Sequence, residues 1–392
     1  MTEPPATPEQ LELLRAHRPY LQYSQDPYRI CSPKVLVDTP PNELRRADGS
    51  VVCACGNAER LLSLDALARY PGDPGDPAPT DYLTAIRGAD DDPPPLQDDP
   101  AYAHRVYGRV VDDGRGGRWL QYWFWIYWNQ KRLLGRGAHE GDWEMIQIHL
   151  GPDGRPDRMT FAQHEHGEAR RLGGREPVIT QRGPDGNEHV VVFVAPFSHA
   201  SYYTAGTKIY AGGTDNPDLS GPRVFPEVEP LGPWAEWPGR WGASRGRWPT
   251  RGTGNSPRSP GHQGIRWTHP DRYHLSANAR KPFEVVLRAL WGLGFMTYPH
   301  APSIEPRLDG RTLHVDYELR PTLLRRPRHV LFSAHSGDRS LATHLLERAP
   351  RRGSVELELP DELEACTVRA TAYNRLNQAS DPAEREAYAS GG

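Results

Sequence analysis

Residues 119–128 read WLQYWFWIYW, and residues 142–150 read DWEMIQIHL. The first stretch is aromatic throughout, which favours a strand over a helix. The second is followed by the turn residues GPDG at 151–154, so we expect the chain to return as a hairpin. Further strands are predicted at residues 102–111, 158–163 and 188–195. Because turns rather than helices join these strands, the sequence predicts a mainly β fold, an antiparallel β-sandwich.

The segments around these strands predict long irregular loops and a few short helices. Residues 7–17 have the pattern of a helix that Thr7 caps and that Pro8 begins. Further short helices are predicted at residues 63–69 and 282–293, and a short buried strand at residues 35–37. Residues 212–272 are rich in Gly, Pro, Trp and Arg, so we expect them to wrap irregularly over the sheets.

The last 90 residues predict a second sandwich. Alternating strands are expected at residues 312–319, 329–333, 354–359 and 366–373. That pattern is typical of a small immunoglobulin-like or fibronectin-like β-sandwich. We therefore assign residues 1–27 to an N-terminal helical extension, 28–303 to the first sandwich, 304–380 to the second, and 381–392 to a flexible tail.

Composition excludes several classes of protein. The chain has 47 basic and 50 acidic residues and a net charge of −3, which argues against a nucleic-acid-binding surface. Its start lacks the pattern of a signal peptide, and no apolar stretch is long enough to span a membrane. Four cysteines in 392 residues do not make a disulfide framework. We therefore expect a cytoplasmic protein whose thiols are reduced.

Two carboxylates stand at one end of the strand expected at residues 142–150. In a strand Asp142 and Glu144 point to the same face, and that face continues with apolar residues. Burying two like charges there is costly unless a cation or hydrogen bonds compensate. His139, expected at the edge of the preceding loop, can turn a ring nitrogen toward them. A divalent cation bound by these three residues would remove the cost, and neutralising Asp142 without the cation should then be neutral or stabilising.

A second candidate segment follows the valine-rich strand at residues 188–195. It delivers Ser198 and His199 at the end of a rigid element, as functional residues often are. The plain alternatives stay open for both segments. The carboxylates can be exposed at a strand end, and His199 can be a hydrogen-bonded core residue.

Together these segments resemble a known family. The resemblance is carried by residues 122–125 (YWFW), 139–144 (HEGDWE) and 192–202 (VFVAPFSHASY). They look like the Vps62-like family (vacuolar protein sorting-associated protein 62-related), which is distantly similar to the Nep1-like (NPP1) necrosis-inducing proteins. In the latter a Gly-His-Arg-His-Asp-Trp-Glu heptapeptide helps to hold a divalent cation in a β-sandwich cavity.

Carried over by position, the resemblance implies a metal site of His139, Asp142 and Glu144 with His199 nearby. Ala138 and Gly141 replace the first glycine and the second histidine of the heptapeptide. A further aspartate that precedes the heptapeptide has Asn129 as its nearest candidate. The carboxylates favour Mg²⁺ or Ca²⁺ as the cofactor, with Mn²⁺ and Zn²⁺ as alternatives.

Three functions are compatible with such a site. The first is cation-dependent recognition of a polar small molecule, a glycan or a lipid head group, with peripheral contact to a membrane left open. The second is a metal-dependent hydrolase, of a phosphoester or a similar substrate, in which His139 or His199 carries protons. The third is a structural ion in an interaction protein.

Two other groups of residues are expected to be structural. His164 and His166 form a His-x-His motif in a stretch that is predicted to be a solvated loop. Five tryptophans can either stack on a ligand or hold a long loop on the sandwich, and the second reading is favoured: Trp234, Trp237, Trp241, Trp248 and Trp267.

Overall fold

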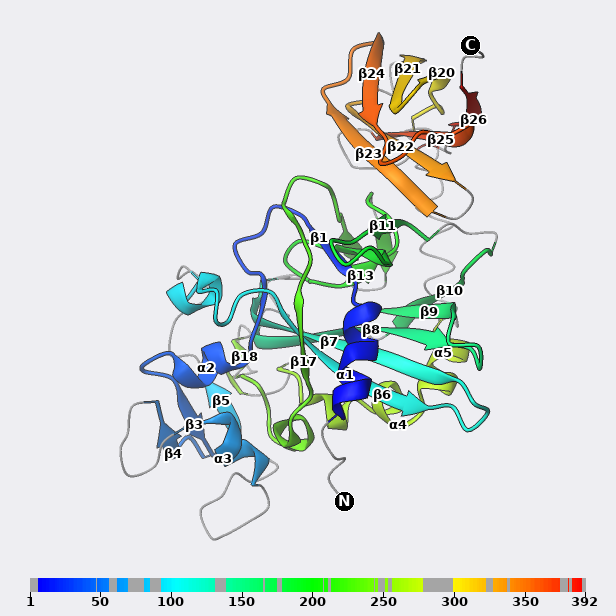
Figure 1. Cartoon of the computed structure of the whole chain (residues 1–392). Coiled ribbons are helices and arrows are strands. Elements are labelled where there is room, and N and C mark those ends of the chain that lie inside the picture. The colour runs from blue at the N-terminus through cyan, green and yellow to red at the C-terminus, as the bar shows by residue number, and fades with distance from the viewer. Residues whose placement is uncertain are drawn as a thin grey trace.

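The fold is mainly β and contains two sandwiches (Figure 1). This computed structural model describes residues 6–46, 48–55, 62–69, 81–84, 93–130, 139–164, 166–174, 178–206, 208–210, 213–242, 244–245, 251–252, 256–277, 299–321, 327–336, 339–373, 380 and 383–389. The helix predicted at residues 282–293 lies outside this range. No helix among these residues is long and apolar enough to cross a membrane.

The larger sheet of the first sandwich is an antiparallel meander with one parallel strand added at its edge. Its strand order is β10-β9-β8-β7-β6-β17. These strands are β6 (Arg105–Asp112), β7 (Arg118–Asn129), β8 (His139–Leu150), β9 (Pro156–Gln163), β10 (His166–Arg171) and β17 (Glu227–Pro230). Three short strands join it: β2 (Ile30–Cys31), β18 (Ser244–Arg245) and β19 (Arg251–Gly252). The predicted hairpin between β8 and β9 is confirmed.

The opposing sheet contains the valine-rich strand. Its members are β1 (Tyr20–Tyr23), β11 (Thr180–Arg182), β12 (Glu188–Val194), β13 (Ser201–Tyr202) and β16 (Arg223–Val224). β1 pairs in parallel with β12. The sequence predicted that residues 20–23 belong to a separate N-terminal extension. That prediction is wrong, because they form a strand of this sheet. The pairing brings together segments about 170 residues apart, which local patterns do not reveal.

Short elements cover the edges of the first sandwich. The helices are α1 (Pro8–Ala16), α2 (Lys34–Asp38), α3 (Leu64–Ala68), α4 (Ile265–Thr268) and α5 (Pro270–Ser276), with 3-10 turns η1 (Pro95–Asp98), η2 (Pro233–Glu236) and η3 (Pro260–His262). Small sheets are formed by β3 (Glu43–Arg45), β4 (Val51–Ala54) and β5 (Tyr82–Thr84), and by β14 (Lys208–Tyr210) and β15 (Gly213–Asp215).

The helix predicted at residues 7–17 is confirmed, with Thr7 accepting a hydrogen bond from the Gln10 backbone. The strand predicted at residues 35–37 is wrong, because these residues form α2. A three-residue apolar run fits a buried helical turn as well as a buried strand.

The second sandwich packs a three-stranded sheet on a four-stranded sheet. Their orders are β20-β21-β24 and β23-β22-β25-β26. The strands are β20 (Ser303–Asp309), β21 (Thr312–Glu318), β22 (His329–Ser336), β23 (Arg339–Glu347), β24 (Arg352–Glu358), β25 (Ala365–Tyr373) and β26 (Ala383–Tyr388). The tail expected at residues 381–392 is wrong in part. Its residues 383–388 form β26, which pairs with β25 along its length.

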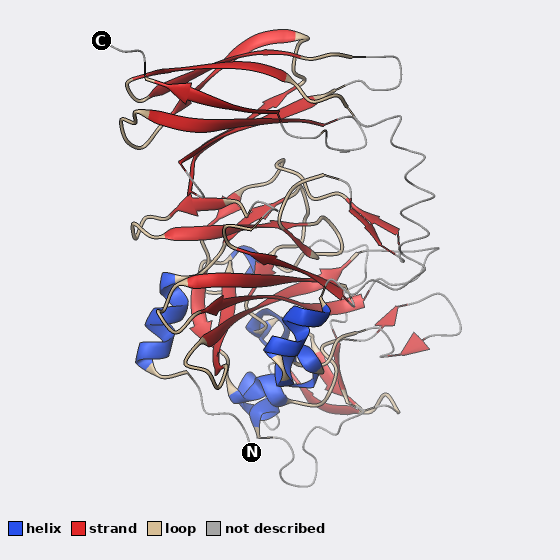
Figure 2. Cartoon of the chain, turned by 90° about the vertical axis from the view of Figure 1, so that its right-hand side faces the viewer, coloured by secondary structure: helices blue, strands red, loops and turns tan. Residues whose placement is uncertain are grey.

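The sheets are stacked, and the second sandwich lies beyond the sheet that contains β12 (Figure 2). On that side Val191 and Phe193 of β12 form a buried apolar cluster that also includes Tyr373 of β25. An ion pair of 3.9 Å joins the side chains of Arg182 and Asp361 across the same boundary. The two sandwiches are therefore in contact through a small apolar core of their own.

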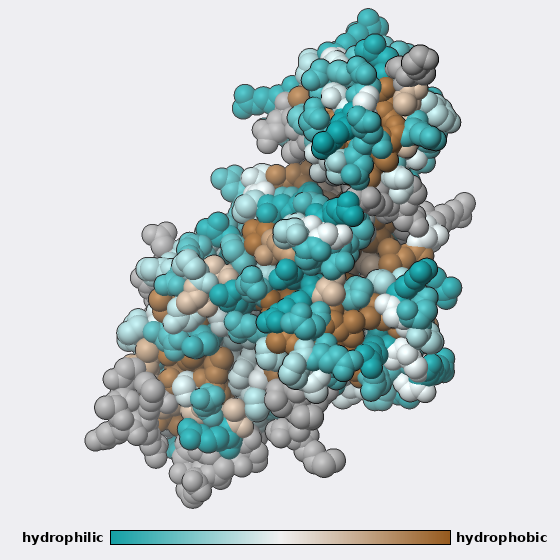
Figure 3. Space-filling view, in the orientation of Figure 1, coloured by the Kyte–Doolittle hydropathy of each residue, from teal (hydrophilic) through white to brown (hydrophobic). Residues whose placement is uncertain are grey.

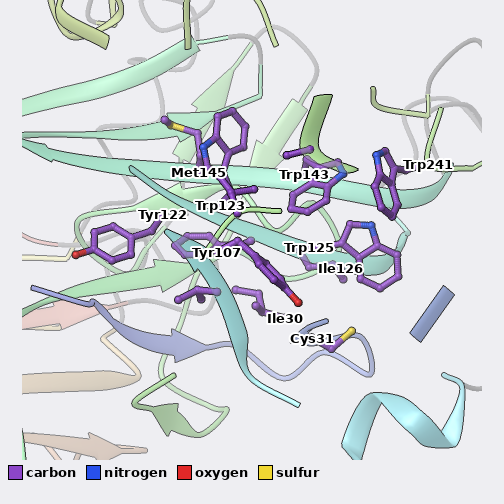
Figure 4. Close-up of a cluster of buried hydrophobic side chains, with 14 of the residues drawn as sticks. Ile30, Cys31, Tyr107, Tyr122, Trp123, Trp125, Ile126, Trp143, Met145 and Trp241 are labelled. Carbon is purple, nitrogen blue, oxygen red and sulfur yellow. The ribbon is translucent and has the colours of Figure 1, made fainter. Parts of the chain in front are cut away.

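Aromatic side chains fill the opposite face of the larger sheet. Trp125 and Trp143 lie next to each other there, and Trp241 packs against both (Figure 4). Trp234 stacks on Trp143 with ring centroids 5.7 Å apart. Trp234, Trp237 and Trp241 are all buried, which confirms that they hold the loop on the sandwich. Trp267 carries the guanidinium of Arg109 on its ring, and Trp248 lies outside the described residues.

The face of the molecule shown in Figure 3 is mainly hydrophilic, with small dispersed apolar patches. Cys31, Cys53 and Cys366 are buried, and none of the four cysteines forms a disulfide. We expect titration of the denatured, unreduced protein to count four thiols. A count of two would show a disulfide and contradict the reduced state expected from the sequence.

Candidate functional site

Strand β8 presents Asp142 and Glu144 to the space between the two sheets. Both side chains are buried, and Ile146 and Ile148 continue the same apolar face, as the alternation predicts. Trp143 points to the opposite face, toward Trp241 (Figure 4). The reading in which these carboxylates are exposed at a strand end is therefore wrong.

His199 reaches this space from a tight turn after β12. The turn is closed by a hydrogen bond from the Ala195 N–H to the Ala200 carbonyl oxygen, at 3.0 Å. Phe197 and His199 both adopt left-handed backbone conformations, with φ of 67° and 56°. Non-glycine residues hold such angles only where surrounding contacts fix them. The turn thus stores local strain to place one imidazole ring.

The ring of His199 lies between two carboxylates. Its Nδ1 is 3.1 Å from Oδ2 of Asp142, and its Nε2 is 3.6 Å from Oδ2 of Asp26. Asp26 was not predicted from the sequence, because a single aspartate in a loop carries no recognisable pattern. The backbone N–H groups of Tyr28 and Phe197 donate to its two oxygens. The contact with Asp142 is a hydrogen bond, whereas Nε2 has no hydrogen-bond partner among the described residues and faces Asp26 as an ion pair.

The charges of Asp26, His199 and Asp142 stabilise one another. Burial alone would lower the pKa of His199, but the neighbouring carboxylates of Asp142 and Asp26 raise it to about 10. Burial would raise the pKa of Asp142, yet the hydrogen bond from His199 and the charges of His139 and His199 lower it overall. The pKa of Asp26 is lowered against burial in the same way. His199 is therefore an imidazolium at neutral pH.

Glu144 lies near these three charged groups but has a different environment. Its Oε2 is buried and has no hydrogen-bond partner within the described part of the chain. Burial and the nearby charge of Asp142 raise the pKa of Glu144 well above its ordinary value. In the protein alone, the carboxyl therefore avoids the cost of an isolated buried charge by holding a proton.

His139 and Asn129 flank the pair from adjacent strands. His139 is the first residue of β8, paired with Asn129 and Ser244, and does not lie in a loop as the sequence analysis expected. Its Nδ1 is 2.8 Å from the Gly141 carbonyl oxygen, so Nδ1 carries a proton and the neutral form of the ring has its lone pair on Nε2. Asn129 enters the site as a donor, since its Nδ2 donates to Asp142 Oδ2 at 2.9 Å.

A second buried carboxylate lies close to Glu144. Asp215 is fully buried and accepts from the hydroxyls of Ser198 and Tyr202 at 2.8 and 2.7 Å. Its Oδ2 is also 2.7 Å from Nε2 of His164. His164 is therefore part of a buried network, and its assignment to a solvated loop is wrong. The side chain of His166 lies outside the described residues.

The residues present fit a hard divalent cation in part. An orphaned carboxylate oxygen beside a second carboxylate is the donor set that Mg²⁺ and Ca²⁺ prefer. The tautomer of His139 is the one found in ligating histidines, whose other nitrogen donates to a carbonyl. However, across the part of the chain that the structure describes, no three His, Cys, Asp or Glu side chains converge as metal ligands. A cation would have to draw these groups closer together.

Gly141 shapes the start of β8 between the predicted ligands. It has a φ of 60°, and an added Cβ would overlap the Trp241 carbonyl oxygen. We expect Gly141→Ala to destabilise the protein by more than about 4 kcal/mol, the range of severe core defects. Gly154 is the matched control, since its φ is 75° and its surroundings are open. Gly154→Ala should cost only about 1–2 kcal/mol. Equal losses in urea unfolding would show that the Trp241 contact does not matter.

Comparison with known proteins gives a weak likeness. No protein-family model and no curated protein matches the chain. Among solved structures, it is similar to NLPPya in complex with glucosamine, with 14% identity, a TM-score of 0.20 and coverage of 29% of this chain and 50% of that one. An NLPPya triple mutant has 13% identity and a TM-score of 0.20, with coverage of 29% of this chain and 48% of that one. A structure described as a toxin fold for microbial attack and plant defense has 12% identity and a TM-score of 0.25, with coverage of 55% of this chain and 76% of that one. The chain spans about half the length of the NLPPya chains, and its likeness to this toxin fold is weak.

Proposed function

We propose that the protein recognises a polar ligand, a glycan or a lipid head group, through a divalent cation held by Asp142 and Glu144. The observation that carries the proposal is the buried Oε2 of Glu144, which has no hydrogen-bond partner among the residues that the structure describes. A cation would displace the proton of Glu144, satisfy this oxygen and compensate the charge that Glu144 then carries beside Asp142. His139 would add Nε2 as a third ligand, and His199 would stay beside the site. The proposal also draws on the resemblance of residues 122–125, 139–144 and 192–202 to the Vps62-like family.

The geometry of His199 supports recognition over hydrolysis. A proton carrier needs a ring nitrogen within reach of the reacting atoms. Both nitrogens of His199 face carboxylates of the protein instead, Asp142 on one side and Asp26 on the other. Its ring therefore serves to fix and balance Asp142. Mg²⁺ and Ca²⁺ are the favoured cations because the available donors are mostly carboxylate oxygens.

The direct test is thermal unfolding of the metal-free protein with a chelator and with excess Mg²⁺, Ca²⁺, Mn²⁺ or Zn²⁺. Binding to the folded state should raise the unfolding temperature as cation concentration increases. If none of the four cations shifts it, the proposed function is wrong. Glucosamine, named in the complex of one similar structure, and phosphatidylinositol vesicles are then tested for binding with the active cation and with chelator. Binding that survives chelation would contradict a cation-dependent site.

A further inference from the structure

Asp215 connects elements that are far apart in the sequence. Its Oδ1 accepts from Ser198 in the turn after β12, and its Oδ2 accepts from Tyr202 in β13. His164, at the end of β9, contacts the same Oδ2 and is the partly exposed member of the group. A buried carboxylate with several donors is strongly held, because hydrogen bonds to charged groups are the stronger kind. Asp215 is therefore a fixed anchor between the two sheets.

Ser198 links this anchor to the candidate site. It lies between Phe197 and His199, the two residues with strained left-handed backbones. On the other side of the turn, the Phe197 N–H donates to Asp26, and the Phe197 carbonyl accepts from the Gln130 N–H at 3.1 Å. The turn is thus held from two directions. The Phe197 contacts are made by the backbone of the turn, whereas the hydrogen bond to Asp215 is made by the side chain of Ser198.

We propose that Asp215 is a positioning residue: through the Ser198 hydroxyl it holds the strained turn so that His199 lies between Asp26 and Asp142. Asp215 does not have to touch a cation or a ligand for this role. The part of the inference that concerns cation affinity rests on the proposed function, whereas the placement of His199 does not. The two can therefore be tested separately.

The experiment compares Ser198→Ala with Tyr202→Phe. Each variant removes one buried hydroxyl donor from Asp215 and leaves its charge in place, but only Ser198 is adjacent to His199. The first readout is the NMR spectrum of the histidine rings, recorded at one pH in chelator on protein labelled at histidine. The second is calcium affinity, measured by titration calorimetry with calcium chloride. Unfolding temperatures report general destabilisation, which both variants should share.

Positioning predicts that Ser198→Ala alone moves the His199 ring signals and weakens calcium binding by about tenfold, the factor expected for one hydrogen bond to a charged group. If both variants or neither move the His199 signals, the inference is overturned. If the wild type binds neither calcium nor any of the other three cations, the proposed function fails and the ring signals alone decide the positioning. Should Ser198→Ala not fold, Ser198→Cys keeps the volume and a weak donor. Unchanged His199 signals in that folded variant, with the hydrogen bond weakened, would also count against the inference.

Discussion

Replacing Glu144 with glutamine is expected to stabilise the metal-free protein at pH 8 and to abolish stabilisation by Mg²⁺ or Ca²⁺. The buried Glu144 carboxyl has a pKa raised well above its ordinary value by burial and by Asp142. Folding therefore takes up a proton that the unfolded chain has lost, and stability falls as the pH rises above 4.5 toward the folded-state pKa. Glutamine has no proton to take up, so the penalty disappears. The gain should therefore grow as the pH rises from 5 toward 9, because the proton that folding takes up becomes scarcer.

The measurement is thermal or urea unfolding of both proteins in chelator and in excess cation, from pH 5 to pH 9. The stability gained by Glu144→Gln should shrink toward pH 5, because near that pH the unfolded chain also begins to hold the Glu144 proton. Glu140→Gln is the matched control, because Glu140 is also fully buried in β8 but has interactions of its own. It should be destabilising at every pH. If Glu144→Gln is destabilising in chelator to the same extent, Glu144 is an ordinary buried acid and the cation site loses its main support.

Replacing Asp142 with asparagine is expected to destabilise the metal-free protein by about 3–5 kcal/mol, the cost of leaving a buried charge without its partner. This reverses the expectation from the sequence, in which neutralising Asp142 only relieves repulsion. The structure shows that Asp142 pairs with the imidazolium of His199 at 3.1 Å. Losing Asp142 therefore leaves that imidazolium with the more distant Asp26. The residue whose neutralisation is stabilising is Glu144 instead.

A double-mutant cycle with His199→Gln measures the pair directly. The double variant should be more stable than the sum of the two single losses predicts, by about 1–3 kcal/mol. Additive losses would show that Asp142 and His199 do not interact in solution.

The ion pair of Asp142 and His199 should also make the stability of the protein fall at alkaline pH. The pKa of His199 is raised to about 10 from 6.5, so its stabilising contribution is complete below pH 6.5 and is lost as the pH rises through about 10. Asp142 and Asp26 have lowered pKa values, so their contributions are present above pH 3.8 and are lost as the pH falls. We expect His199→Gln to remove the loss of stability near pH 10. An unchanged alkaline profile would contradict the imidazolium assignment.

Local patterns in the sequence were enough to predict the framework of the site. The aromatic run in β7, the hairpin after β8 and the alternation of Asp142 and Glu144 with Trp143 depend on neighbouring residues only. Strand periodicity is a property of a few consecutive residues, so these features are visible without the fold. The same alternation correctly placed both carboxylates on a buried face.

The partners of those buried groups were decided by the tertiary structure alone. Asp142 and His199 are 57 positions apart, and Asp26 comes from the loop after β1. No short-range pattern encodes such a meeting, because it depends on how two sheets pack and on the parallel pairing of β1 with β12. The sequence alone therefore determined that Asp142 and Glu144 share the core-facing side of one strand, whereas long-range packing decided which charged groups they meet. His199 lies within reach of Asp142 and Asp26, while the buried Oε2 of Glu144 meets no donor in the described ranges.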